Sequence, residues 1–346
     1  MPANLSPEYK QAEASFRAAR DDGARLTCLK DMLRTIPKHK GTENMQADLK
    51  SRIKQLSDDL SGPKKGAART GPVRSVRPEG AAQIVLLGPP NAGKSSLHAK
   101  LTHSRAAVGP YPHTTHEPMP GMLPFEDIHF QLVDLPPVSV DYFEGWLVST
   151  LQTADAALLV VDLADPSCAD DVAAILRHLD GKKVTLTEHW PRSGVIQRML
   201  VSNEDDAAYD PFRIYLPTLL IANKADLNPA IAEDIGVLKE LTGIAFPALA
   251  VSAERGDALG EIGGFLFAEL QIVRVYTKSP GKPAEMDRPF TLRRGATVLD
   301  VARLVHKDLA AGLKYARAWG AGVFDGQQVG PEHTVADRDL IELHMR

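Results

Sequence analysis

A glycine-rich loop that follows an apolar run is the part of the sequence best suited to chemistry. Residues 84–96 read Ile-Val-Leu-Leu-Gly-Pro-Pro-Asn-Ala-Gly-Lys-Ser-Ser and contain the complete G-x-x-x-x-G-K-[ST] pattern. The glycines let backbone N–H groups curl around a phosphate, and the helix expected to begin near Lys94 points its positive end at the anion. Lys94 can reach the β- and γ-phosphates of a nucleotide, and the Ser95 hydroxyl can bind Mg²⁺. The residues expected to bind nucleotide here are Gly88, Pro89, Pro90, Asn91, Ala92, Gly93, Lys94, Ser95 and Ser96.

A carboxylate and a threonine-bearing loop are further candidates for binding a divalent cation. Asp134 follows the apolar run 128–133, and a carboxylate at that strand end can hold Mg²⁺ through water; the alternative is a loop or capping acid. Residues 111–115, Tyr-Pro-His-Thr-Thr, form a loop in which a threonine can bind Mg²⁺ and sense the γ-phosphate. We favour Thr115 over Thr114, and the alternative is a plain polar loop. The expected catalytic residues are Lys94, Thr115 and Asp134, and the expected Mg²⁺ ligands are Ser95, Thr115 and Asp134.

A second set of polar residues can recognise a nucleotide base. It follows the apolar run 218–222 and reads Asn223-Lys224-Ala225-Asp226. The Asp226 carboxylate can accept hydrogen bonds from both N1–H and N2–H₂ of guanine, a pair that adenine does not offer, so an ATPase is disfavoured. Asn223 can bond either guanine O6 or the glycine loop. The residues of this set expected at the base are Asn223, Lys224 and Asp226.

The spacing of apolar runs predicts the scaffold that must position these residues. Strands are expected at 83–87, 128–133, 156–161, 218–222 and 246–251, with helical stretches between them. Such continuously apolar strands are typical of a parallel sheet buried on both faces. The sequence therefore predicts an α/β fold over residues 81–270, a doubly wound, mostly parallel sheet that binds its ligand at the carboxyl ends of the strands. Residues 180–215 fit this pattern poorly and are expected to form a divergent insertion.

Helices are expected in the N-terminal region, residues 1–60. Ser6 and Pro7 are typical of a helix start, and this helix is expected to run to about Asp21. A second helix is expected over 24–35. A third begins near Thr42, and its apolar residues share one face, which favours helix–helix packing. These residues are Met45, Leu49, Ile53, Leu56 and Leu60. Residues 61–80 are rich in Gly, Pro and basic side chains and are expected to be a flexible linker.

The C-terminal region, residues 271–346, is expected to be a separate small domain. Residues 272–277 alternate like a strand, with 290–292 as its hairpin partner. Thr297 is expected to cap a helix that runs to about Ala310. Short strands are expected over 316–319 and 339–343. Two strands, a helix and two further strands are typical of a ubiquitin-like β-grasp.

Charge is uneven along the 346 residues although the net charge is only −4. Residues 1–80 hold 16 Lys and Arg against 10 Asp and Glu, residues 81–270 hold 12 against 25, and residues 271–346 hold 12 against 9. Basic ends suggest a polyanionic partner such as RNA, and a solvated surface without a partner is an equally weighted alternative.

Cys28 and Cys168 have no paired spacing, so neither a disulfide framework nor a zinc site is expected. The absence of a long apolar run and of a signal pattern predicts a cytoplasmic protein without membrane contact.

Several of these segments resemble one family of GTPases. The form Gly-x-Pro-Asn-x-Gly-Lys-Ser, together with Tyr-Pro-x-Thr-Thr, resembles the Obg family of translation-factor-class GTPases. Residues 35–43 are similar to the N-terminal helical segment of its developmentally regulated GTP-binding (DRG) branch. Ser252-Ala253 resembles the short element whose backbone supports guanine O6. The segments that resemble the C-terminal TGS domain of the DRG branch are residues 273–278, 306–309, 315–320, 328–330 and His333.

This resemblance covers most of the chain except residues 180–215, where the family carries a longer inserted domain. It implies binding of GTP and GDP, slow Mg²⁺-dependent hydrolysis of GTP, and association with ribosomes or ribosomal RNA through the basic N-terminal region and the TGS domain. It leaves open whether a partner protein stabilises the chain. It also implies that Asn91 helps to hold K⁺ beside the phosphates in place of an arginine finger, so K⁺ stimulation of hydrolysis is a hypothesis.

One segment departs from the family pattern. The family has Asp-x-Pro-Gly, whereas this chain has Asp134-Leu135-Pro136-Pro137. The glycine N–H normally bonds the γ-phosphate, and proline has no N–H and a fixed φ. We therefore expect weaker discrimination between GTP and GDP than in a glycine-bearing relative, and no catalytic glutamine follows in residues 138–140. The alternative function is a guanine-nucleotide-binding scaffold or regulator with little catalysis. A metabolic kinase is a further alternative, but no acceptor-site pattern stands out.

Overall fold

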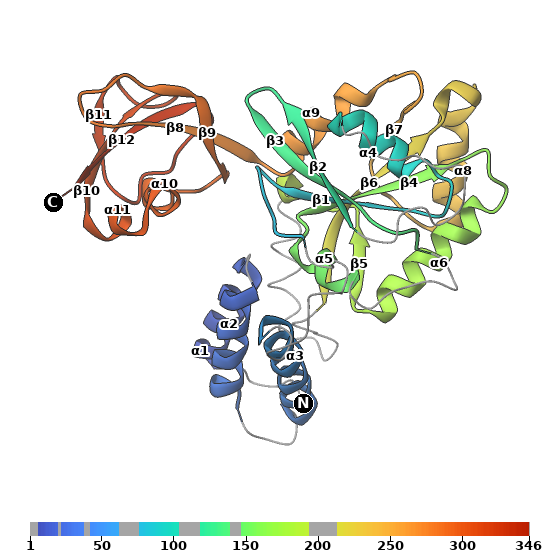
Figure 1. Ribbon diagram of the computed structural model, residues 1–346, viewed down its shortest axis with the longest axis horizontal. Helices are drawn as coiled ribbons and strands as arrows, with labels where there is room; N and C mark the ends of the chain where they lie inside the picture. The colour runs from blue at the N-terminus through green and yellow to red at the C-terminus, as the bar shows by residue number, and fades with distance from the viewer. Residues whose placement is uncertain are drawn as a thin grey trace, which may run out of the picture. The chain divides into compact units, whose positions relative to one another are not determined.

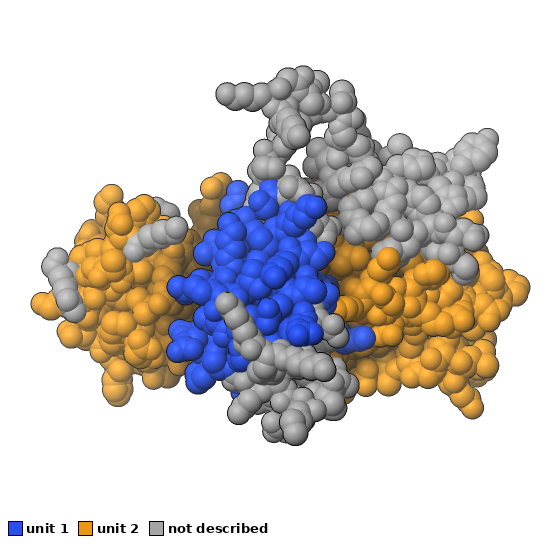
Figure 2. All heavy atoms as spheres, turned by 90° about the horizontal axis from the view of Figure 1, so that it is seen from below, with its two compact units in different colours: residues 1–77, 197–214 blue, residues 78–196, 215–346 orange. Residues whose placement is uncertain are grey.

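A computed structural model describes residues 6–19, 22–37, 42–61, 76–103, 118–138, 147–193 and 213–345. The chain divides into two compact units, coloured in Figure 2. The first comprises residues 1–77 with 197–214, and the second comprises residues 78–196 with 215–346. No helix in these described ranges is long and apolar enough to cross a membrane.

The first unit is built on three helices, α1 (Pro7–Ala18), α2 (Asp22–Thr35) and α3 (Glu43–Ser61) (Figure 1). The Ser6 hydroxyl caps α1 by accepting a hydrogen bond from the Tyr9 N–H, and it donates to the Thr35 carbonyl, which ties the start of α1 to the end of α2. The helix ends at Ala18, three residues before the expected end. The helices enclose a core that confirms the expected apolar face of α3, apart from Leu60, whose side chain lies outside the description. This core contains Tyr9, Leu29, Met32, Ile36 and Leu49, with Met45, Ile53 and Leu56 partly buried against it.

The second unit contains a seven-stranded sheet in the order β2-β3-β1-β4-β6-β5, with β7 beside β6 (Figure 1). The pairs β1–β3, β1–β4, β4–β6 and β6–β7 are parallel, and β2–β3 is antiparallel. These strands are β1 (Gln83–Leu87), β2 (Met119–Phe125), β3 (Ile128–Asp134), β4 (Ala156–Asp162), β5 (Val184–Thr187), β6 (Ile214–Asn223) and β7 (Ala248–Ala250). Both faces of the central strands are buried, as the sequence predicts. The helices and 3₁₀ turns of this part are α4 (Lys94–Thr102), α5 (Leu147–Thr153), α6 (Cys168–Gly181), α8 (Ile231–Thr242), α9 (Leu259–Glu269), η2 (Pro191–Ser193) and η4 (Ala225–Leu227).

Two strands of this sheet are not among the sequence predictions. The edge strand β2 reads Met-Pro-Gly-Met-Leu-Pro-Phe, and its prolines and glycine hide it from any strand pattern. Strand β5 lies inside the range 180–215, where an insertion is expected. The same range contains Trp190, which is buried and packs edge-on against Phe265 of α9 at a ring distance of 5.1 Å. At least residues 184–190 therefore belong to the sheet and its core, whereas residues 194–212 lie outside the described part.

The C-terminal residues of the second unit form a separate five-stranded sheet in the order β11-β10-β12-β8-β9. Strand β12 is parallel to β8, and the other pairs are antiparallel. A core that includes Val275, Val301, Ala316 and Ile341 lies between the sheet and α10. This arrangement confirms the expected β-grasp, and β11 is an addition to the expected strands. The elements are β8 (Ile272–Lys278), β9 (Glu285–Arg293), α10 (Val298–Val305), α11 (Lys307–Gly312), β10 (Leu313–Trp319), β11 (Gln327–Val329) and β12 (Asp339–Met345).

The helix expected from Thr297 to about Ala310 is divided in two. Its start is as predicted, because Thr297 and Asp300 form a reciprocal capping box. The backbone of His306 is extended, with φ −166° and ψ 143°, and ends α10 at Val305. The His306 side chain then caps α11 by accepting a hydrogen bond from the Asp308 N–H. A histidine that serves both as the end of one helix and as the cap of the next leaves no gap in the apolar pattern, so periodicity alone does not reveal the break.

Leu49→Ala should destabilise the helical unit by roughly 2–5 kcal/mol, because Leu49 is fully buried in its core and the smaller side chain leaves a cavity. The measurement is hydrogen exchange of the α2 and α3 amides. The neighbouring exposed residue provides a control, since Lys50→Ala should change stability by less than about 0.5 kcal/mol. Equal effects of the two substitutions would contradict the packing described above.

Candidate functional site

The glycine-rich loop joins β1 to α4, and its two outer glycines are required by close backbone contacts. Gly88 has φ 147°, and a Cβ at this position would lie 2.2 Å from the Val160 carbonyl oxygen of β4. Gly93 has φ 88°, and a Cβ would lie 2.3 Å from the Asn223 amide nitrogen. Any other residue at these two positions would push the loop away from the strand ends. The loop is therefore held tightly against β4 and β6.

Asn91 lies in the middle of this loop with a left-handed backbone, φ 60°. Asparagine tolerates this conformation better than most residues other than glycine. The backbone thus supplies a conformational reason for asparagine that does not depend on a bound K⁺. The role of Asn91 as a K⁺ ligand stays a prediction.

Lys94 is buried at the first position of α4, and its ammonium is held by the loop. Its Nζ donates to the carbonyl oxygens of Gly88 at 3.0 Å and Pro89 at 2.7 Å. Burial lowers the pKa of Lys94 to about 8, and the negative charge of Asp134 partly opposes this shift. A phosphate in the loop would compete with the two carbonyls for the ammonium and would favour its charged form.

Ser95 and Asp134 meet beside Lys94. Asp134 is the last residue of β3, which lies parallel to β1, and the Ser95 hydroxyl donates to its carboxylate at 2.5 Å. Both side chains present oxygen, the ligand atom that Mg²⁺ prefers, so the pair fits the expected metal site. The described residues contain no group of three or more His, Cys, Asp and Glu side chains able to hold a metal, so phosphate oxygens would complete the coordination. Thr114 and Thr115 lie outside the described residues.

The buried Asn223 side chain connects the phosphate loop to the other expected base-binding segment. Its amide nitrogen donates to the Ala92 carbonyl oxygen at 3.1 Å, and its amide oxygen accepts from the Ala253 N–H at 3.1 Å. Of the two roles open to Asn223, the structure shows contact with the loop. The Ala253 N–H, a candidate for guanine O6, is used in the same bridge. One side chain thus brings together segments that are more than a hundred residues apart.

Asp226 is held as a charged acceptor at the same edge of the sheet. The Ser252 hydroxyl donates a hydrogen bond to it and lowers the pKa of Asp226, with a smaller contribution from Arg255. The Ser252 oxygen in turn accepts from the Arg255 N–H at 3.0 Å. Ser252, expected to act through its backbone, therefore also orients the carboxylate that would read N1–H and N2–H₂.

Lys224 makes a contact that the sequence analysis does not include. It has a left-handed backbone, φ 60°, and its Nζ lies 2.6 Å from a carboxylate oxygen of Asp162. Asp162 is the last residue of β4 and stands beside Asn223 in the sheet. Asp162 follows an apolar run directly, as Asp134 does, and this position in the sequence could have identified Asp162 as a candidate site residue.

The segment after Asp134 is packed against the phosphate loop. Leu135, Pro136, Pro137 and Val138 are all buried, and the Val138 N–H donates to the Gly88 carbonyl oxygen at 3.4 Å. Neither proline has an N–H, so Val138 provides the first N–H after Leu135. That donor is already used by the loop.

Comparisons with known proteins agree with this fold. The family described as 50S ribosome-binding GTPase matches residues 83–189, and the TGS domain family matches residues 273–345. The chain is 27% identical to an uncharacterised GTP-binding protein of Methanocaldococcus jannaschii, covering 91% of this chain and 90% of the relative. It is 24% identical to developmentally-regulated GTP-binding protein 2 of Homo sapiens, covering 91% of this chain and 96% of that relative. The crystal structure of a GTP binding protein from Pyrococcus horikoshii OT3 matches 76% of this chain and all of that chain with a TM-score of 0.51 at 17% identity, which shows a common fold.

Lys94 should titrate near pH 8 when no nucleotide is added, because its burial disfavours the charged ammonium. Its folded-state pKa lies below the ordinary value, so the charged lysine costs folding free energy at neutral pH, and this cost is relieved as the pH rises above about 8. The measurement is an NMR titration of lysine side-chain signals. GDP with Mg²⁺ should move the midpoint upward, since phosphate charge stabilises the ammonium.

The Lys94 signal can be assigned by its loss in Lys94→Arg. A control is Lys100, which lies on the same helix and is exposed. A titration in which every lysine signal has its midpoint above pH 10 would contradict the buried position of Lys94.

Proposed function

Because this chain is a DRG-like GTP-binding protein with a P-loop GTPase domain and a C-terminal TGS domain, we propose that it binds GTP and GDP with Mg²⁺ and hydrolyses GTP slowly. We further propose that it acts in the cytoplasm in association with ribosomes or ribosomal RNA.

The observation that carries the proposal is the Asn223 bridge. It holds the phosphate loop, the segment that contains Asp226 and the Ser252–Ala253 turn as one assembly. A hydrogen bond from the Ser252 hydroxyl lowers the pKa of Asp226 and orients its carboxylate, which can accept two hydrogen bonds from one base edge. Guanine offers that pair of donors. This arrangement supports a guanine nucleotide as the ligand of the site.

The phosphate end of the site supports Mg²⁺-dependent hydrolysis. Lys94 can neutralise phosphate charge from inside the loop, and Ser95 and Asp134 would hold Mg²⁺. When bound, Mg²⁺ would supply positive charge where negative charge develops on the phosphates. Thr115 remains the candidate for sensing the γ-phosphate.

The buried segment 135–138 supports slow turnover. It consists of Leu, Pro, Pro and Val, which provide no acid, base or amide side chain to orient an attacking water. The first N–H after its two prolines, at Val138, donates to the Gly88 carbonyl oxygen. The same observation favours a second candidate function, a guanine-nucleotide-binding scaffold with little catalysis. Both candidate functions require binding of GTP and GDP, and they differ in the rate of GTP hydrolysis.

Ribosome association rests on charge and on the matched families. The N-terminal residues 1–80 and the C-terminal residues 271–346 carry an excess of basic side chains, which favours a polyanionic partner. The family that matches residues 83–189 is described as ribosome-binding. We propose that the two basic regions dock on ribosomal RNA, while the GTPase domain reports the nucleotide state. A K⁺ held by Asn91 is proposed to assist hydrolysis.

Asp226→Asn should weaken GDP binding by about 10- to 100-fold, because the amide places a donor where the base also donates and leaves a hydrogen bond unmade. The same variant should gain affinity for xanthosine diphosphate, whose base carries an acceptor in place of the 2-amino group. The measurement is competition of unlabelled nucleotides against fluorescent GDP. Glu254→Gln is a matched control, since Glu254 is an exposed acid in the adjoining turn and should leave both affinities unchanged. Retained GDP affinity in Asp226→Asn would argue against guanine recognition at this site.

Single-turnover hydrolysis of GTP should be slow and should accelerate about tenfold or more when ribosomes are added in K⁺ buffer. Equal rates in Na⁺ and K⁺ would remove Asn91 as a K⁺ ligand. Tight binding of GTP and GDP without cleavage under any of these conditions would favour the scaffold function instead.

Pro137→Gly should increase the preference for GTP over GDP, because it restores a backbone N–H at the position where the family bonds the γ-phosphate. The measurement is the ratio of the two dissociation constants, with turnover measured beside it. Pro136→Gly controls for added flexibility, since it changes the neighbouring buried proline. An unchanged ratio in Pro137→Gly would show that the missing N–H does not limit discrimination.

A further inference from the structure

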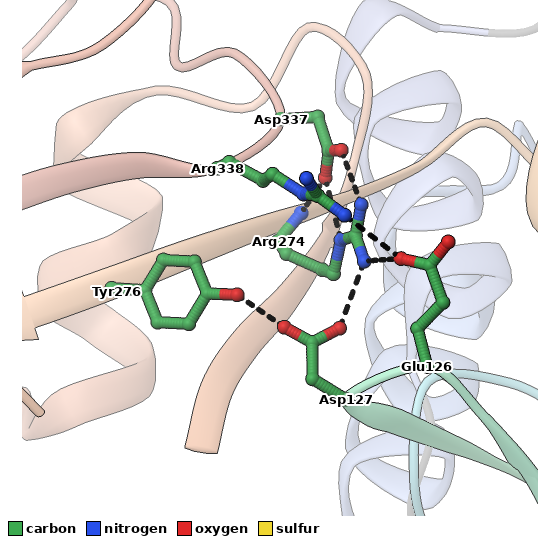
Figure 3. A network of polar contacts seen from close by, with 6 residues as sticks. All are labelled: Glu126, Asp127, Arg274, Tyr276, Asp337 and Arg338. Carbon is green, nitrogen blue, oxygen red and sulfur yellow. Dashed lines mark hydrogen bonds and ion pairs between the residues drawn. The ribbon is translucent and has the colours of Figure 1, made fainter. Parts of the chain in front are cut away.

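A buried arginine of the TGS domain lies at the centre of a network of polar contacts (Figure 3). Arg274 of β8 is 3% exposed. Its guanidinium donates to the Asp337 carboxylate through Nε at 3.0 Å and Nη2 at 2.7 Å, and its backbone N–H donates to the same carboxylate at 2.8 Å. This bidentate pair lies within the TGS domain and fixes the orientation of the guanidinium.

The remaining guanidinium nitrogen crosses to the GTPase domain. Nη1 donates to Asp127 at 2.8 Å and also to Glu126. Figure 3 shows both acids on the turn between β2 and β3, facing the guanidinium. The Tyr276 hydroxyl donates to the other oxygen of Asp127, and Arg338 donates to Glu126 at 3.0 Å. We call these six residues the Arg274 cluster: Glu126, Asp127, Arg274, Tyr276, Asp337 and Arg338.

The Arg274 cluster holds three carboxylates and two guanidinium groups, and each carboxylate accepts a hydrogen bond from Arg274. Hydrogen bonds from Arg274 hold the pKa of Glu126 below its usual value. Burial alone would raise the pKa of Asp127, but hydrogen bonds from Tyr276 and Arg274 lower it. A buried guanidinium is costly unless its donors are all paired, so Arg274 depends on acids from both domains. The turn between β2 and β3 is thus bound firmly to the TGS domain.

The other end of the same hairpin lies in the nucleotide site. Strands β2 and β3 pair without interruption from Phe125 opposite Ile128 to Met119 opposite Asp134. Asp134 accepts the hydrogen bond from Ser95. A paired strand of seven residues spans about 20 Å and resists slippage, because a shift of one residue would turn its side chains to the wrong face. Movement of Asp134 along the strand axis would therefore be carried to Glu126 and Asp127.

A second contact between the two domains does not involve this turn. Arg293 of β9 donates to Asp155 at 2.7 Å, and Asp155 accepts from the Gln83 N–H at the start of β1. The Arg274 cluster is therefore one of at least two polar attachments between the GTPase and TGS domains. The second attachment also provides a contact of the same chemistry that lies outside the hairpin turn.

We propose that the Arg274 cluster couples the TGS domain to nucleotide occupancy of the phosphate loop, with hairpin β2–β3 as the connecting element. The cluster positions Asp134 from a distance. In turn, nucleotide bound with Mg²⁺ at Ser95 and Asp134 changes the stability of the hydrogen bonds in the cluster. The two effects are equal in free energy because coupling between sites is reciprocal. This inference rests on the proposed function only in that a guanine nucleotide is the ligand. It does not require sensing of the γ-phosphate, so Pro137 leaves it intact.

The test combines hydrogen exchange with GDP affinity in the full chain. In the wild type, GDP with Mg²⁺ should change exchange in β8 and in residues 336–339, although these lie in the TGS domain. The double variant Glu126→Gln with Asp127→Asn removes the acids on the GTPase side and leaves the Arg274–Asp337 pair in place. It should abolish this response and change the GDP dissociation constant by about fivefold or more. These acids lie on a turn, whereas removal of Arg274 itself would leave Asp337 without its partner and endanger folding.

The matched control is Arg293→Gln, which breaks the second attachment. It should lower the stability of the domain contact while keeping the exchange response and a GDP dissociation constant within about twofold of the wild type. If the double variant keeps both the exchange response and the GDP affinity, the cluster is only a static attachment and the inference is overturned. The inference is equally overturned if wild-type protein binds GDP without any change in TGS exchange. Failure of wild-type protein to bind GDP would instead overturn the proposed function, so the two failures are distinguishable.

Discussion

The nucleotide site depends on a single buried amide. The buried Asn223 amide donates to Ala92 and accepts from Ala253, and burying it without these partners would be costly. The same contact explains why Gly93 has no side chain, since a Cβ would collide with the amide. It also sets the distance between the phosphate loop and the turn that orients Asp226. One side chain at the end of β6 therefore joins the two segments proposed to contact the phosphates and the base of a nucleotide.

Residues that follow buried strands were the most predictable part of the site. Apolar runs mark parallel strands, and parallel strands end at one edge of a sheet, so Asp134, Asn223 and Ser252 had to lie close to Gly88. Asp162 fits the same rule and could have been included. The β-grasp was predictable for a similar reason, because alternation in β8 and the capping box at Thr297 are local signals.

Other features have no local signal. Arg274 and Asp127 are separated by 147 positions, and nothing in either neighbourhood indicates that they pair. Strand β2 contains two prolines, which a central strand would not tolerate, so only its position at the sheet edge explains it. The short strand β5 lies in a polar context, and η2 follows within a few residues. In each case tertiary contacts decide the structure and local preference does not. Thr115 remains a prediction from sequence.

The two prolines of β2 also determine what this side of the sheet can pair with. Pro120 and Pro124 are four residues apart, so their nitrogens point to the same side of the strand. Because a proline nitrogen cannot donate to a paired strand, that side is the one away from β3. Of the backbone nitrogens on that side, Met122 alone keeps a hydrogen to donate. An edge with one donor in three makes a poor template for a strand from another molecule. The protein thus carries, within the hairpin whose turn contacts the TGS domain, a built-in protection against edge-to-edge aggregation.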